Sequence, residues 1–288
     1  MRSPLKLRSS TMAFEPKPPP FDLDPEQIAP DTFLIRSVQK AMGVPLYVQI
    51  NSMVIKGKEP IIIDTGTRAN RTKWLSDVFS LVEPEDVRWV FVSHEDVDHI
   101  GNLEQVLTAC ENATLVVDWG VCERYSNAFD FPLERCRWIE HGESFDIGDR
   151  VLKVHRPPIY DSPSTHGLFD TSTGVYWAVD AFASGIPDPT MDLHDLNHDE
   201  WIEGMGIGAY DGVSAWLPLV DPAKFNRAID DMVGLGISAI ASAHSPMLRD
   251  TLIDQAIERL RQLPTSELQA PPGQSVLDEI IAATARLN

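Results

Sequence analysis

A cluster of histidine and carboxylate side chains directly follows a short apolar run of this chain. Residues 89–92 read Trp-Val-Phe-Val, and residues 93–102 read Ser-His-Glu-Asp-Val-Asp-His-Ile-Gly-Asn. An apolar run of this length predicts a buried strand. It costs free energy to bring three carboxylates and two imidazoles together at the end of one strand, unless a cation neutralises the carboxylates. We therefore interpret residues 94–99 as half of a metal site.

The length and charge of the chain narrow the classes of protein to which it can belong. With 288 residues and 43% hydrophobic content, the chain is long enough for one large α/β domain. A formal net charge of −19 opposes binding to nucleic acid or to an anionic membrane. No apolar run approaches the roughly 18 residues that span a bilayer, and the N-terminus lacks the apolar centre of a signal peptide. We expect a cytoplasmic protein with a flexible arm over residues 1–31 and one domain over residues 32–288.

Strand-like and helix-like periods alternate along the chain, which favours an α/β fold. We expect paired strands at 47–50 and 53–55, and further strands at 61–63, 113–117, 151–154, 174–179 and 238–241. Helical spacing of apolar residues predicts helices at 74–82, 103–110, 225–233, 251–263 and 276–286. Asp64, Asp180 and His244 each come at or just after the end of a predicted strand, which is the pattern of a site built at the edge of a sheet.

The ordered set of these residues resembles the metallo-β-lactamase superfamily. The resemblance covers residues from about 32 to 263 and rests on Asp64-Thr65-Gly66, on the spacing His94-x-Asp96-x-Asp98-His99, on Asp180 and on His244. It implies an α/β fold of four layers, the αββα metallo-β-lactamase sandwich, with a two-metal site at one edge of the sheets.

Two details resemble the di-iron branch of this superfamily, which includes the flavodiiron proteins. Zinc hydrolases have a second His where this chain has Asp96, and the di-iron branch has Glu there. Residues 175–182, Val-Tyr-Trp-Ala-Val-Asp-Ala-Phe, resemble the flavodiiron stretch in which the bridging Asp is followed by Ala-Phe. No flavodoxin-like domain follows in the sequence, so we expect no FMN site in this chain.

The resemblance implies a complete set of metal ligands. Metal site one would use His94, Asp96 and Asp161, metal site two would use Asp98, His99 and His244, and Asp180 would bridge them. Asp161 stands where the family usually has a His, and His166 is an alternative as a ligand or as an acid/base group. This oxygen-rich set suits iron, our preferred metal, although zinc or manganese could also bind.

Other side chains near these positions carry weaker expectations. Asp64 is expected to support the metals from a tight turn rather than to bind them, and Glu95 is expected to be solvated. Trp201 and Tyr210, on a variable insertion, are candidates to contact a ligand, and Tyr210 is also a candidate catalytic residue. The acidic segment 188–200 is either a solvated loop or a lid.

Three functions are compatible with the sequence. The first is a di-iron oxidoreductase that binds or reduces O2 or a related small oxidant, or that oxidises a small substrate, with electrons from a separate redox partner protein. The second is a zinc-dependent hydrolase of an ester, thioester, lactone or phosphodiester. The third is a non-catalytic sensor with an altered metal site. The sequence leaves the substrate and the formation of a homo-oligomer open.

Overall fold

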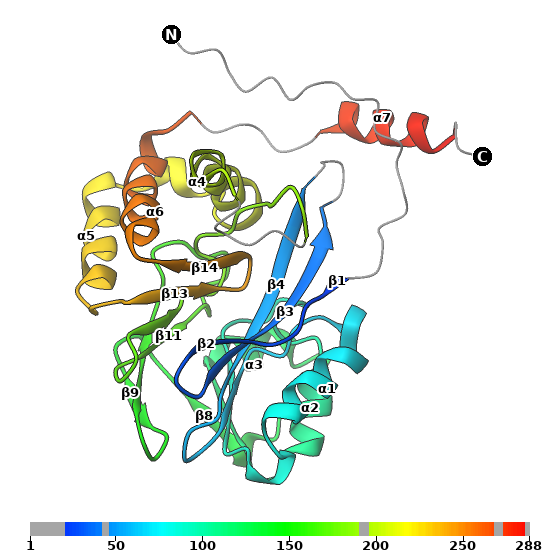
Figure 1. Ribbon diagram of the computed structural model, residues 1–288, viewed down its shortest axis with the longest axis vertical. Helices are drawn as coiled ribbons and strands as arrows, with labels where there is room; N and C mark the ends of the chain where they lie inside the picture. Colours follow the sequence, from blue (N-terminus) through cyan, green and yellow to red (C-terminus); the bar gives the residue numbers. More distant parts are fainter. Residues whose placement is uncertain (1–20, 42–45, 190–195, 268–272, 286–288) are drawn as a thin grey trace.

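Two mixed β-sheets form the centre of the computed structural model, which describes residues 21–41, 46–189, 196–267 and 273–285 (Figure 1). The first sheet has eight strands in the order β1-β3-β4-β5-β6-β7-β8, with β2 also paired to β3. Its strands are β1 (Phe21–Asp22), β2 (Glu26–Ala29), β3 (Thr32–Lys40), β4 (Tyr47–Ile55), β5 (Ile61–Ile63), β6 (Trp89–Val92), β7 (Thr114–Val117) and β8 (Cys136–Trp138).

The second sheet has six strands in the order β14-β13-β12-β11-β10-β9. Its strands are β9 (Ser144–Asp146), β10 (Val151–His155), β11 (Gly167–Asp170), β12 (Val175–Trp177), β13 (Ala239–Ser242) and β14 (Ser245–Arg249). Most of its pairs are antiparallel, but β12 and β13 run parallel. The chain therefore leaves β12 and β13 at the same edge of this sheet.

Helices cover the outer face of each sheet (Figure 1). Helices α1 (Arg71–Leu81), α2 (Leu103–Ala109) and α3 (Trp119–Tyr125) share an apolar cluster with the first sheet. Helices α4 (His198–Ile207), α5 (Pro222–Val233) and α6 (Thr251–Gln262) share another with the second, and α7 (Gln274–Ala285) follows near the C-terminus. A third cluster lies between the sheets and includes Phe91 and Trp177. The expected αββα sandwich is confirmed.

The strands β5, β6, β7 and β8 form the parallel part of the first sheet, and β5 and β6 approach the site. They are parallel because the chain returns through a helix between each pair. All three residues of β5 are fully buried, as are Val90, Phe91 and Val92 of β6. Burial on both faces explains why these strands read as continuous apolar runs rather than as alternating patterns. The carboxyl ends of β5 and β6 therefore deliver Asp64 and the 93–102 loop to one edge.

The expected strand pair at 47–50 and 53–55 was wrong, because residues 47–55 form one continuous strand. β4 pairs with β3 along all nine of its residues, and β3 was not predicted. The polar residues Asn51 and Ser52, which lie between the two expected strands, are both buried. Asn51 remains within the strand because its Nδ2 donates to the carbonyl oxygens of Ser242 and Ser245 on the other sheet, at 2.9 and 3.0 Å.

The N-terminal region also differs from expectation. Residues 21–29 were assigned to the flexible arm, but they form β1 and β2, which pair with β3. Residues 1–20 lie outside the described part of the chain. Among the helices that the structure describes, none is both long and apolar enough to cross a membrane.

Candidate metal centre

Four loops bring the seven predicted ligands to one edge of the sandwich. The loop after β6 carries the four ligand candidates of the 94–99 segment, the segment after β10 carries Asp161, and the turns after β12 and β13 carry Asp180 and His244. Their ligand atoms form three overlapping groups, each within 4.8 Å, and together the groups contain His94, Asp96, Asp98, His99, Asp161, Asp180 and His244. The sequence-predicted set is thus assembled in space without exception.

Asp180 lies at the centre of the seven side chains, and its two oxygens face different partners. Oδ2 lies 3.2 Å from Nε2 of His94. Oδ1 lies 3.0 Å from Nε2 of His99 and 3.1 Å from Nε2 of His244. A carboxylate in this arrangement can offer one oxygen to each of two ions.

The remaining carboxylates extend the two sides of this arrangement. Nε2 of His94 lies 3.7 Å from Oδ1 of Asp161 and 3.8 Å from Oδ2 of Asp96. On the other side, Nε2 of His244 lies 3.5 Å from Oδ2 of Asp98. These separations exceed hydrogen-bond length and leave room for a cation between the donors. Apart from the shared Asp180, the side of His94 therefore has two carboxylates and one imidazole, and the side of His244 has one carboxylate and two imidazoles.

Buried atoms without partners show that this donor set fits metal ions. Nε2 of His94 and Oδ1 of Asp180 are both buried, and neither makes a hydrogen bond of good geometry to the described residues. Buried polar atoms are nearly always satisfied in folded proteins, so atoms left over in this way point to a missing partner. A metal ion would satisfy both atoms, and three imidazoles with four carboxylates are donors that iron, manganese or zinc can bind.

The pKa values show that protons balance the charge of the cluster when no cation does. Burial acts to lower the pKa of His99, but the carboxylates of Asp180 and Asp64 outweigh it and raise this pKa well above its usual value. Burial likewise acts to raise the pKa of Asp180, but His99 and His94 hold it well below the usual range. A metal ion must therefore displace protons from these imidazoles.

Contacts behind the cluster fix the orientation of two imidazoles. Nδ1 of His99 lies 3.0 Å from Oδ2 of Asp64, which also accepts hydrogen bonds from Ser93 Oγ at 2.8 Å and Trp177 Nε1 at 3.1 Å. Nδ1 of His244 lies 2.8 Å from the carbonyl oxygen of Gln49. In both residues Nε2 is the nitrogen that faces Asp180. Asp64 thus lies behind the ligands, as the sequence analysis expected.

The backbone on both sides of Asp180 is strained. Val179 has φ 55° and Phe182 has φ 71°, in the left-handed region that β-branched and bulky residues rarely enter. The carbonyl oxygen of Val179 accepts hydrogen bonds from Ser242 Oγ and from the backbone N–H of Ala243, both at 2.8 Å. Each such residue costs about 1–3 kcal/mol and persists only where the surroundings enforce it. Here the neighbouring strand β13 holds the turn that presents Asp180.

Of the two predicted catalytic residues, His166 is described by the structure, and it does not join the cluster of ligand candidates. His166 is buried, and its Nδ1 lies 3.0 Å from the carbonyl oxygen of Ser164 and 3.7 Å from Oδ2 of Asp118. Burial and the nearby Arg156 lower the pKa of His166 to about 4, which keeps the imidazole neutral. The side chain of Tyr210 lies outside the described part of the chain.

Two further expectations concerned residues of the insertion. Trp201 is buried in the core between the second sheet and its helices, and it is not one of the residues of the ligand cluster. The acidic segment 188–200 is described only in part. Helix α4 begins within it at His198, and residues 190–195 lie outside the described residues.

The expectation that Glu95 is solvated was wrong. Its carboxylate accepts hydrogen bonds from Ser162 Oγ at 2.8 Å, from Ser164 Oγ, and from Arg124 Nη1 at 3.0 Å. These partners lie 29 to 69 residues away along the chain, so only the folded structure shows the connection. In the local sequence, the one feature that points to these contacts is the position of Ser162 and Ser164, which flank Pro163 immediately after the predicted ligand Asp161.

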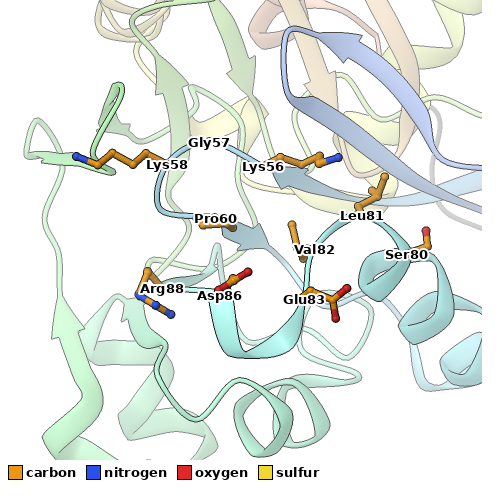
Figure 2. A pocket seen from close by; sticks show the side chains of 10 residues that line it. All are labelled: Lys56, Gly57, Lys58, Pro60, Ser80, Leu81, Val82, Glu83, Asp86 and Arg88. Atoms are coloured by element: carbon orange, nitrogen blue, oxygen red, sulfur yellow. The ribbon is translucent and has the colours of Figure 1, made fainter.

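Two surface hollows lie apart from the cluster. Figure 2 shows one of about 470 Å³, lined by Lys56, Lys58, Arg88 and neighbouring residues. It lies at the amino ends of β5 and β6, whereas the ligand candidates follow the carboxyl ends of strands. The other, of about 710 Å³, is lined in part by Tyr160 and Trp216, and Tyr160 immediately precedes Asp161.

Comparison with known proteins finds relatives that are longer than this chain. A diflavin flavoprotein A 1 from Synechocystis sp. strain PCC 6803 is 24% identical over 224 residues, which are 76% of this chain and 37% of that protein. The flavo-diiron protein FprA2 of Clostridium acetobutylicum is 22% identical over 223 residues, 76% of this chain and 54% of that protein. The chain thus spans only a part of each relative.

The fold is also found among solved structures. The rubredoxin oxygen:oxidoreductase of Desulfovibrio gigas superposes with a TM-score of 0.71 and 16% identity, covering 83% of this chain and 61% of that one.

The family model described as ODP family beta lactamase matches residues 48–207, more than half of this chain. This match agrees with the resemblance to the di-iron branch of the metallo-β-lactamase superfamily. The chain belongs to the ODP family of beta lactamases.

Proposed function

We propose that this chain is a di-iron oxidoreductase domain that reduces O2 or a related small oxidant. In this proposal His94, Asp96 and Asp161 would hold one iron, Asp98, His99 and His244 would hold the other, and Asp180 would be shared by both. We call these metal site one and metal site two.

The observation that carries the proposal is the position of Asp180 between two sets of donors. Its Oδ2 faces His94, and its Oδ1 faces His99 and His244, at 3.0 to 3.2 Å. A single ion would need only one of these sets. The arrangement therefore supports two ions that share one carboxylate.

The donor types favour iron. Three imidazoles and four carboxylates form a mainly hard donor set, which suits iron or manganese better than zinc. Zinc sites are typically richer in nitrogen or sulfur donors. The four negative charges also nearly cancel those of two divalent ions, so they favour the ferric over the ferrous state. A bound water is acidified less at such a site than at a His-rich zinc pair, which makes hydrolysis the weaker alternative. The name rubredoxin oxygen:oxidoreductase, borne by a protein of the same fold, supports O2 as the oxidant.

The number of electrons that the reaction takes determines whether the domain needs an external electron donor. Two ferrous ions held by these residues would supply two electrons, which with two protons are enough to reduce O2 to hydrogen peroxide. Reduction to two waters takes four electrons and four protons, so sustained turnover requires an external donor. We propose a separate redox protein in this role.

The test is metal analysis followed by rapid mixing with oxygen. Protein purified anaerobically and loaded with ferrous iron is expected to hold two irons per chain and to consume O2 as its spectrum changes from ferrous to ferric. An Asp180→Ala variant treated in the same way serves as the control and is expected to show neither effect. No oxygen-dependent change in the loaded wild type, together with rapid zinc-dependent cleavage of esters or phosphodiesters, would establish a hydrolase instead.

A further inference from the structure

The segment that carries Asp161 has no regular secondary structure of its own. It runs from residue 156, after β10, to residue 166, before β11. The other ligand candidates lie within a few residues of a strand end or in the compact 93–102 loop. The position of Asp161 therefore depends on contacts that this segment makes with the rest of the protein.

The carboxylate of Glu95 joins this segment to the 93–102 loop beside Asp161, and the backbone N–H of His166 joins it at its far end by donating to the carbonyl oxygen of Ser93 at 3.0 Å. Oε1 accepts hydrogen bonds from Ser162 Oγ at 2.8 Å and from Arg124 Nη1 at 3.0 Å, and Oε2 accepts one from Ser164 Oγ. The side chain is only 15% exposed, and both serines are buried. Hydrogen bonds to an ionised acceptor are roughly twice as strong as neutral ones.

The same contacts lead back to the metal ligands. The backbone N–H of Ser162 donates to Oδ1 of Asp161 at 2.7 Å, and this Oδ1 is the oxygen that lies 3.7 Å from Nε2 of His94. His94 is joined to Glu95 by a peptide bond. Covalent bonds, hydrogen bonds and the His94–Asp161 contact therefore connect His94, Glu95, Ser162 and Asp161 in a closed ring.

Metal site two is held by different contacts. His99 lies against Asp64, and His244 against the carbonyl oxygen of Gln49. The loop is also anchored there by the backbone N–H of Thr65, which donates to the carbonyl oxygen of His99 at 2.6 Å. None of these described contacts involves Glu95 or Ser162.

We propose that Glu95 is a positioning residue for metal site one: its carboxylate fixes Asp161 relative to His94 and so sets the affinity of that site alone. This inference rests on the proposed two-metal centre. Residues that orient metal ligands typically change metal affinity by about 10- to 100-fold when they are replaced. Because site two is anchored separately, its affinity is expected to stay unchanged.

The experiment titrates metal-free protein anaerobically with Co²⁺, whose visible absorption reports each site, and then measures bound ferrous iron. For Glu95→Ala we expect the affinity of one site to fall by about 10- to 100-fold while the other keeps its wild-type value. Glu95→Gln retains one acceptor oxygen, so the affinity of its weakened site is expected to lie between the values for Glu95→Ala and the wild type. Glu123→Ala, which removes an exposed carboxylate of the neighbouring α3, is the matched control and is expected to bind like the wild type.

A second set of variants separates positioning from general stability. The double variant Ser162→Ala/Ser164→Ala removes only the two hydroxyls and is expected to reproduce the loss at one site, even if Glu95→Ala does not fold. Adding Glu95→Ala to Asp161→Ala is expected to cause no further loss of metal, because both changes act on the same site.

Equal weakening of both sites in these variants, or wild-type affinity at both, would overturn the inference. Metal occupancy does not depend on oxygen, so the outcome is independent of the proposed activity. A wild-type protein that binds two metal ions but does not react with O2 would contradict the proposed function alone.

Discussion

Oδ2 of Asp64 lies 3.0 Å from Nδ1 of His99, and both side chains are buried. This contact determines which imidazole nitrogen is available on the opposite side. Nε2 of His99 faces Asp180 at 3.0 Å, so Asp64 orients a proposed metal ligand without approaching the metal position.

Replacing Asp64 with Asn is therefore expected to weaken metal site two. The amide has nearly the same shape but no charge to stabilise His99, and we expect the affinity of that site to fall by about 10- to 100-fold. Co²⁺ titration measures the change. Asp86→Asn, at an exposed position outside the cluster, is the control. Wild-type binding by Asp64→Asn would show that the Asp64 contact only supports the fold.

Removal of the bridging carboxylate is expected to be more severe than removal of one imidazole. Asp180→Ala is expected to lose both ions, and His94→Ala is expected to lose mainly the ion of metal site one. A ligand present at 100 times its Kd stabilises the folded state by about 2.7 kcal/mol, so the rise in Tm on metal addition is expected to disappear in Asp180→Ala. Elemental analysis and thermal melts of both variants, with His198→Ala as control, measure these effects. Unchanged metal content in both would refute the ligand assignment.

The third ligand of metal site one can be tested by changing its chemistry. Asp161→His replaces a hard oxygen donor with an imidazole nitrogen, which is expected to shift the preference of that site from iron toward zinc. Competition between equal concentrations of the two metals, followed by elemental analysis, measures the ratio. Asp254→His on α6 controls for an added surface imidazole. If the ratio does not respond, and His166→Ala instead loses metal, His166 holds that position.

Metal binding is expected to weaken as the pH falls. In the metal-free protein burial acts to lower the pKa values of His94, His99 and His244, but the surrounding carboxylates raise them above 6.5. Competition by protons therefore begins above pH 6.5, and the apparent affinity falls by about tenfold per pH unit for each proton displaced.

The stability of the metal-free protein is expected to change in the opposite direction. A raised pKa contributes stability that is fully present below pH 6.5 and is lost as the pH rises through the folded-state pKa. The gain in Tm on adding metal is therefore expected to grow between pH 6 and pH 8. A gain that is independent of pH would argue against imidazole ligands.

The ligand cluster could be predicted from the sequence because most of its information is local. Six consecutive residues supply four of the seven side chains, and Asp180 and His244 each follow a recognisable apolar strand. The strand β3 was missed because polar residues such as Arg36 and Gln39 interrupt its apolar pattern. Here pairing with β4 along nine residues overrides a weak local preference.

The surroundings of the cluster could not be predicted in the same way. Glu95 was expected in solvent, but its carboxylate contacts another segment of the chain. The hydrogen bonds from Ser162 and Trp177 cross 67 and 113 residues of chain. Such contacts depend on the relative position of the two sheets, which a pattern within one segment does not encode.

Neither sheet alone carries a complete set of donors for either proposed ion. His94 to His99 come from the first sheet, and Asp161, Asp180 and His244 come from the second. If the polypeptide were divided in the connection between β8 and β9, each fragment would hold only part of both sites. Reassociation of the fragments would then be linked to metal concentration, with the ions acting as crosslinks between two halves whose apolar faces already match.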